Sequence, residues 1–168
     1  MIATVLIADD HWAIRQTLSD VVSRCPELRL LAQADDGVQA LALAKELQPD
    51  VLVLDISLPQ LRGMQVLRQL RAAGSKVKIL IFTMYPADQY ADIARHWGAQ
   101  GFLSKDADGP TIVAAIQSVA RGETVFPATL PSVSNAPAAA TPRRTLDTLS
   151  QREAEVFKAL VQAARRAE

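Results

Sequence analysis

Over residues 1–122, short apolar runs alternate with longer segments in which apolar positions recur at offsets of three and four. Continuous apolar runs are typical of parallel strands buried on both faces, and the other spacing is typical of helices that bury one face. The runs predict strands at Thr4–Ala8, Leu28–Ala34, Val51–Leu54, Val77–Phe82 and Gly101–Leu103. The helical patterns that follow them include Ile14 to Cys25, Val38 to Leu47, Leu67 with Leu70, Tyr90 to Trp97, and Ile112 to Ala120.

Strands that alternate with helices along a chain favour a parallel sheet with right-handed crossovers and helices on both faces. The pattern therefore predicts an α/β fold with a doubly wound sheet. Residues 1–122 are assigned to this domain.

The character of the sequence changes after this domain. Four of the nine prolines fall between Pro127 and Pro142, among Ala, Ser and Thr and with almost no charge. Such a segment cannot bury enough apolar surface to order itself, so residues 123–148 are predicted to be a linker.

A new helical signal begins within residues 149–168. Ser150 and Glu153 have the spacing of a capping box, in which each side chain binds a backbone N–H of the first turn. Apolar residues at helical spacing follow, at Val156, Phe157 and Leu160. We therefore expect one additional helix in this segment.

The composition is that of an ordinary globular protein. Of 168 residues, 49% are hydrophobic and 21% are charged, and the formal net charge is zero. A chain with this balance has no dominant electrostatic attraction to nucleic acid or to a membrane surface. Cys25 is the single cysteine, which excludes an internal disulfide and favours a reducing compartment. We find neither a signal peptide nor an apolar run that could span a membrane, and expect a cytoplasmic protein without membrane partners.

Polar and charged residues follow four of the predicted strands. Asp9 and Asp10 follow the first strand, Asp55 the third, Thr83 the fourth and Lys105 the fifth. Ligands of open parallel sheets bind at this edge. Crowded carboxylates repel one another unless a cation neutralises them, and an all-oxygen cluster suits Mg²⁺. Thr83 and Lys105 can bind phosphoryl oxygens, so the pattern favours a dianion on Asp55.

These strand ends resemble those of the receiver domain of bacterial response regulators. The resemblance rests on Asp9-Asp10-His11, Asp55-Ile56-Ser57-Leu58-Pro59 with Gly63, Thr83-Met84, and Gly101-Phe102-Leu103-Ser104-Lys105. It covers residues 3–122. It implies a flavodoxin-like sheet of five parallel strands in the order 2-1-3-4-5, and a role in two-component signalling, that is, in a phosphorelay.

The resemblance also implies the acceptor and the metal ligands. Asp55 would take a phosphoryl group from a sensor histidine kinase or from a small phosphodonor. Mg²⁺ would be bound directly by Asp10, by Asp55 and by the backbone carbonyl of Ser57, and through water by Asp9.

Further roles follow from the same resemblance. Thr83 and Lys105 would bind the phosphoryl group, and Thr83 with Phe102 would form the pair that switches on phosphorylation. The protein would form a homodimer when phosphorylated. It would be a signalling protein, and no enzyme beyond its own phosphoryl transfer and dephosphorylation. Many receivers carry a cis proline after the lysine, whereas Asp106 follows here, so a trans bond is expected.

The last segment extends the resemblance. Residues 149–156, LSQREAEV, are similar to the opening helix of the LuxR-type helix-turn-helix of NarL/FixJ regulators. That motif reads DNA through a second helix, which the printed sequence does not include. We expect an output domain truncated after its first helix, with DNA binding and transcription regulation only in a longer form. The alternative is a stand-alone receiver that acts by binding another protein.

Two enzymatic or ligand-binding alternatives have weaker support. Haloacid-dehalogenase-like phosphatases also use an aspartyl phosphate, but they carry a second aspartate where this sequence has Ser57. A dinucleotide site needs G-x-G-x-x-G, which the seven glycines never form. His11 has no partner cluster in the sequence and is not expected to bind a metal.

Overall fold

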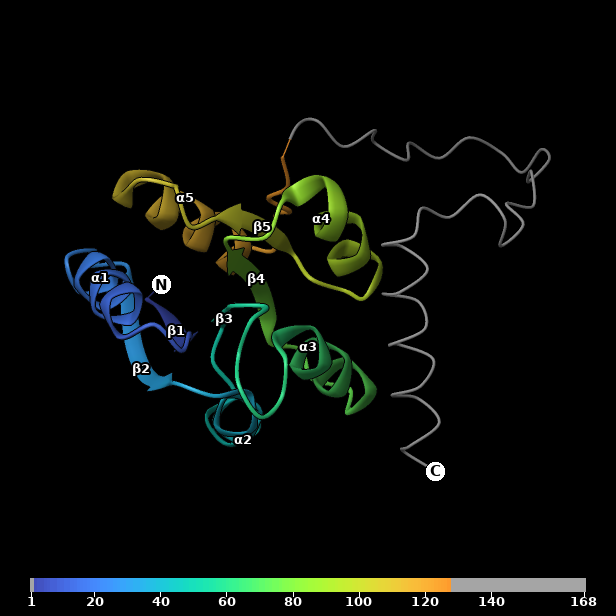
Figure 1. Cartoon of the computed structure of the whole chain (residues 1–168). Coiled ribbons are helices and arrows are strands. Elements are labelled where there is room, and N and C mark those ends of the chain that lie inside the picture. The colour runs from blue at the N-terminus through green and yellow to red at the C-terminus, as the bar shows by residue number, and fades with distance from the viewer. Residues whose placement is uncertain (1, 128–168) are drawn as a thin grey trace, which may run out of the picture. The chain divides into compact units, whose positions relative to one another are not determined.

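The computed structural model of the protein describes residues 2–127, in which strands and helices alternate strictly (Figure 1). The elements are β1 (Ala3–Ala8), α1 (Trp12–Ser23), β2 (Leu28–Ala34), α2 (Gly37–Leu47), β3 (Val51–Leu54), α3 (Gly63–Ala72), β4 (Lys78–Thr83), α4 (Ala87–His96), β5 (Gly101–Ser104) and α5 (Gly109–Ala120). The predicted strand–helix units are confirmed. Their ends differ slightly, since β4 begins at Lys78 rather than Val77 and β5 continues to Ser104.

All strands are parallel and lie in the order β2-β1-β3-β4-β5, which confirms the predicted flavodoxin-like topology. The order reverses at β1, which pairs with β2 on one side and with β3 on the other. Ala8, the last residue of β1, lies beside Leu54, the last residue of β3. The residues that follow these two strands are therefore neighbours at the point where ligands of such sheets bind.

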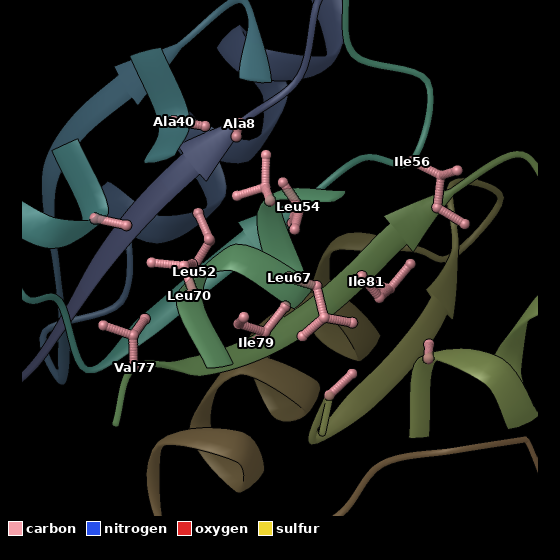
Figure 2. Packing of buried hydrophobic residues seen from close by; sticks show 14 of the residues in the cluster. Ala8, Ala40, Leu52, Leu54, Ile56, Leu67, Leu70, Val77, Ile79 and Ile81 are labelled. Atoms are coloured by element: carbon pink, nitrogen blue, oxygen red, sulfur yellow. The ribbon is translucent and has the colours of Figure 1, made fainter. Parts of the chain in front are cut away.

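Alternate side chains of the strands fill two cores, one on each face of the sheet. The core beneath α1 and α5 includes the strand residues Val5, Ile7, Val51, Val53, Leu80 and Phe82. The core beneath α2, α3 and α4 includes the strand residues Leu6, Ala8, Leu52, Leu54, Ile79, Ile81 and Phe102. Figure 2 shows this second core, to which α3 contributes Leu67 and Leu70. Burial on both faces explains why β3 and β4 have continuous apolar sequences.

The start of α3 lies against the backbone at the end of β3. The amide of Gly63 donates a hydrogen bond of 3.0 Å to the carbonyl oxygen of Ile56. A Cβ atom on Gly63 would lie only 1.9 Å from the carbonyl oxygen of Asp55. Because no side chain fits there, Gly63 sets the distance between α3 and the residue that follows β3.

After α5 the chain returns to the edge of the sheet. Val125 forms a parallel bridge with Gly101, donates a 2.9 Å hydrogen bond to Gln100 and accepts one of 2.7 Å from the amide of Phe102. Phe126 packs beside α4, with the guanidinium of Arg95 4.2 Å from its ring centroid. The first residues of the segment predicted as a linker thus pair with β5. The rest of that segment and the predicted helix in 149–168 lie outside the described residues.

Two further observations concern residues 2–127. No helix in this range is both long enough and apolar enough to cross a membrane. Every peptide bond in it is trans, including the bond between Lys105 and Asp106.

We predict that Gly63→Ala destabilises the domain by about 1–3 kcal/mol, because the new methyl group displaces backbone at the end of β3. Gly109→Ala is the matched control, since Gly109 also begins a helix but its Cβ would meet only a Val21 methyl at 3.5 Å. Urea unfolding of the two variants measures the difference. Equal loss of stability in both would contradict the argument from close approach.

Candidate functional site

Backbone hydrogen bonds extend the sheet by one residue at three strand ends. The amide of Asp55 donates to the carbonyl of Ala8 at 2.9 Å, that of Asp9 to Ala34 at 3.1 Å, and that of Lys105 to Thr83 at 3.0 Å. The sheet therefore fixes the backbone positions of three of the charged residues predicted to form the site. Their side chains meet above the carboxyl edge of β1, β3 and β5.

Lys105 lies between two buried carboxylates. Its Nζ is 2.8 Å from Oδ2 of Asp55 and 2.6 Å from Oδ2 of Asp9. The side chains of Lys105, Asp9 and Asp55 are 3%, 2% and 0% exposed. Buried charges are costly when unpaired, so each carboxylate depends on the ammonium group, and the ammonium group on both carboxylates.

The pKa values of this group show the same dependence. Burial by itself would lower the pKa of Lys105, but contacts with Asp55 and Asp9 outweigh burial and raise it above its ordinary value. Burial by itself would raise the pKa of Asp55, but hydrogen bonds from Lys105 and Ser57 hold that pKa below its ordinary value. Lys105 and Asp55 are therefore both charged at neutral pH.

The two oxygens of Asp55 have different surroundings. Oδ2 accepts hydrogen bonds from Lys105 and from the hydroxyl of Ser57, each at 2.8 Å. Oδ1 is buried and has no hydrogen-bond partner in the described part of the chain. A buried acceptor without a donor is unusual and suits a cation or an incoming ligand.

An acidic cluster surrounds this oxygen. Asp9, Asp10, His11 and Asp55 each offer one ligand atom, and these atoms lie within 4.8 Å of one another. Hard carboxylate oxygens are the donors that Mg²⁺ prefers, and the free Oδ1 of Asp55 is available to it. The donor set therefore fits a magnesium ion.

Thr83 and Phe102, the predicted switch pair, are both buried. Thr83 is fully buried, and its Oγ1 accepts a 3.3 Å hydrogen bond from the amide of Tyr85, which leaves the hydroxyl hydrogen available to donate. Phe102 is 2% exposed and belongs to the core beneath α4. The structure thus brings Thr83 to the site edge and places Phe102 below it.

Two residues at this site were not anticipated. The Nδ1 atom of His11 lies 2.8 Å from Oδ1 of Asp10, although the sequence suggested no cluster around this histidine. Arg15 donates a 2.7 Å hydrogen bond to the backbone carbonyl of Asp9. Both contacts depend on how the side chains are oriented at the start of α1, and no residue spacing in the sequence indicates that orientation.

We predict that Lys105→Met lowers the free energy of unfolding by about 3–5 kcal/mol at neutral pH, because two buried carboxylates lose their cation. The loss will be smaller near pH 4. In the wild type the lowered pKa of Asp55 makes a contribution that is present above the unfolded-state pKa and disappears as pH falls through the folded-state pKa. In the variant, Asp55 stays buried but loses Lys105, so the pKa of its carboxyl group is raised. The stability of the variant therefore declines as pH rises.

Urea unfolding at about pH 4 and at neutral pH tests this expectation. Lys76→Met, at an exposed lysine, is the control and should change stability little at either pH. A wild-type-to-Lys105→Met difference that stays constant between the two pH values would argue against the charge cluster as its cause.

Comparison with known proteins agrees with this geometry. Residues 5–117 match the model of the response regulator receiver domain family. The nitrate/nitrite response regulator protein NarL of Escherichia coli strain K12 is 30% identical over 163 residues, covering 95% of this chain and 76% of that protein. BvgA of Bordetella pertussis, a putative positive transcription regulator of virulence factors, is 30% identical over 159 residues and covers 94% and 76%.

Solved structures give the same result. The receiver domain of the putative response regulator NarL from Mycobacterium tuberculosis superposes with a TM-score of 0.70 at 31% identity, covering 73% of this chain and 98% of that one. A LuxR-family two-component response regulator from Aurantimonas gives a TM-score of 0.71 at 31% identity, over 74% and 89%. The chain therefore belongs to the receiver-domain family of two-component response regulators, and its relatives include transcription regulators of the NarL and LuxR type.

Proposed function

We propose that this protein accepts a phosphoryl group on Asp55 and that Mg²⁺ assists the transfer. The observation that carries the proposal is the environment of Asp55: a buried carboxylate, ionised through Lys105, with one oxygen that has no hydrogen-bond partner within the described residues. The donor would be the phosphohistidine of a sensor histidine kinase, or a small phosphodonor such as acetyl phosphate.

The protein's own residues supply most of what the reaction needs. An ionised Asp55 is the nucleophile: a bond forms between its oxygen and phosphorus while the bond from phosphorus to the donor's nitrogen or oxygen breaks. Lys105 is already within hydrogen-bond distance of Asp55 and would neutralise charge on the transferred group. The hydroxyl of Thr83 would donate to a phosphoryl oxygen.

Asp10, Asp55 and the backbone carbonyl of Ser57 would hold Mg²⁺, with Asp9 acting through water. The ion supplies positive charge to the phosphoryl oxygens during transfer. The described carboxylates outnumber the cations that contact them, which supports a role for a divalent ion here.

The proposed switch begins at Thr83, whose hydroxyl would turn toward the new phosphoryl group. Phe102 is already in the core, so its response would be to repack rather than to become buried. Such repacking would alter the surface of the domain, at α1 and α5 or at α4 and α5, and so shift a two-state equilibrium toward a homodimer.

The output of this cytoplasmic regulator would depend on the length of the chain. In a form with a complete LuxR-type domain, phosphorylation would control DNA binding and transcription, as the names of the relatives suggest. The alternative is a stand-alone receiver that acts through protein–protein contacts. In either case we propose that it catalyses only its own phosphoryl transfer and dephosphorylation.

Incubation with acetyl phosphate and Mg²⁺ should add the mass of one phosphoryl group to the intact protein. Asp55→Asn should abolish the gain, because the amide is not a nucleophile, and a chelator should abolish it in the wild type. Asp50→Asn is the matched control, since Asp50 precedes β3 at the opposite end of the strand and binds Thr4. A folded wild type that gains no mass and binds no beryllium fluoride with Mg²⁺ would refute the proposal.

Thr83→Ala should still gain the phosphoryl mass but should lose the conformational response. Hydrogen exchange of the β5 amides measures this response, and the phosphorylated wild type should differ from its unphosphorylated form there. Thr83→Ser, which keeps the hydroxyl, should behave like the wild type. An undiminished response in Thr83→Ala would exclude Thr83 as the start of the switch.

A further inference from the structure

The geometry points to His11 as a positioning residue for the divalent cation: its imidazole fixes the carboxylate of Asp10 while its backbone amide fixes that of Asp9. This inference rests on the proposed magnesium site and adds to it a residue that would shape the ligands without binding the ion.

The two contacts are distinct and point to different carboxylates. Nδ1 of His11 lies 2.8 Å from Oδ1 of Asp10, and the amide of His11 donates a 2.8 Å hydrogen bond to Oδ1 of Asp9. Nδ1 of His11 also lies 3.4 Å from Oδ1 of Asp9, so the imidazole faces both carboxylates of the acidic pair. A single residue therefore orients both members of the acidic pair.

His11 lies at the capping position of a helix but does not cap it. His11 is the residue immediately before α1, where a side chain ordinarily caps the free amides of the first turn. Its side chain makes no such bond and turns to Asp10 instead. The first turn of α1 therefore has no side-chain cap from His11, and the imidazole lies beside Asp9 and Asp10 instead.

Asp10 needs such support more than its neighbours do. Asp9 and Asp55 are enclosed and held by Lys105, whereas the side chain of Asp10 is 35% exposed. In the described part of the chain, the imidazole of His11, itself 63% exposed, is the only side chain within ion-pair distance of the carboxylate of Asp10. Without the contact to His11, the side chain of Asp10 would sample several rotamers. The ion would then have to order this side chain when it binds, which lowers the affinity. Hydrogen-bond partners of metal ligands typically change affinity by about 10–100-fold.

A direct role as a ligand is the competing explanation, since a ring nitrogen of His11 lies within 4.8 Å of the carboxylate ligand atoms. The two roles differ in metal preference. An imidazole ligand favours Mn²⁺ and later transition metals over Mg²⁺, whereas a positioning residue supports both ions alike.

Titration of the full chain with Mg²⁺ by calorimetry, and with Mn²⁺ by electron paramagnetic resonance, separates these roles. We expect His11→Ala to lower the affinity for Mg²⁺ and the affinity for Mn²⁺ by the same factor, about 10–100-fold. His11→Asn should restore most of the affinity, because its side-chain amide can donate a hydrogen bond to the carboxylate of Asp10 from a similar position. His96→Ala, at the other histidine of the chain and on its exposed surface, should bind both ions like the wild type.

Each remaining outcome has a separate meaning. Unchanged affinity in His11→Ala would overturn the inference while leaving the magnesium site intact, provided that Asp10→Asn abolishes binding. Loss of Mn²⁺ affinity alone, without rescue by His11→Asn, would overturn it in favour of direct ligation. If the wild type binds neither ion, the proposed metal site fails and the inference fails with it. The urea midpoint of each variant reports whether it is folded.

Discussion

The ammonium group of Lys105 holds together two carboxylates that would otherwise repel each other in a buried site. Asp9 follows β1, Asp55 follows β3 and Lys105 follows β5, so this interaction joins three strand ends across the width of the sheet. It also keeps Asp55 ionised, and the other carboxylate oxygen of Asp55 has no hydrogen-bond partner among residues 2–127. The same contacts thus stabilise the fold at its carboxyl edge and keep a carboxylate ionised there, as the proposed phosphoryl transfer requires.

The core supports the site directly. The backbone of Asp55 is hydrogen-bonded to β1, and its carbonyl oxygen is in close approach to Gly63 at the start of α3. Below the same edge, Thr83 ends a strand buried on both faces. Catalytic and binding groups mounted on such elements keep their geometry without ligand, which suits a reaction in which positioning and electrostatics contribute most.

Much of this arrangement was predictable from sequence. Apolar runs identified the strands, charged or polar residues follow them, and parallel topology then required Asp9, Asp55 and Lys105 to share an edge. Contacts between side chains were harder to predict from the sequence. That His11 turns from the helix start toward Asp10 depends on backbone angles of −81° and 108° that no spacing encodes. The pairing of Val125 was also missed, because two apolar residues, Val125 and Phe126, are too few to predict a strand.

That pairing has a consequence for strand-to-strand association through the edge of the sheet. β5 is an edge strand, and an open edge offers unpaired amides and carbonyls to a strand of another molecule. Here the backbone of Val125, in the same chain, is hydrogen-bonded to the amide of Phe102 and to the carbonyl of Gln100. Edge-to-edge aggregation through β5 would first have to displace this segment. The residues after α5 therefore protect this edge of the sheet.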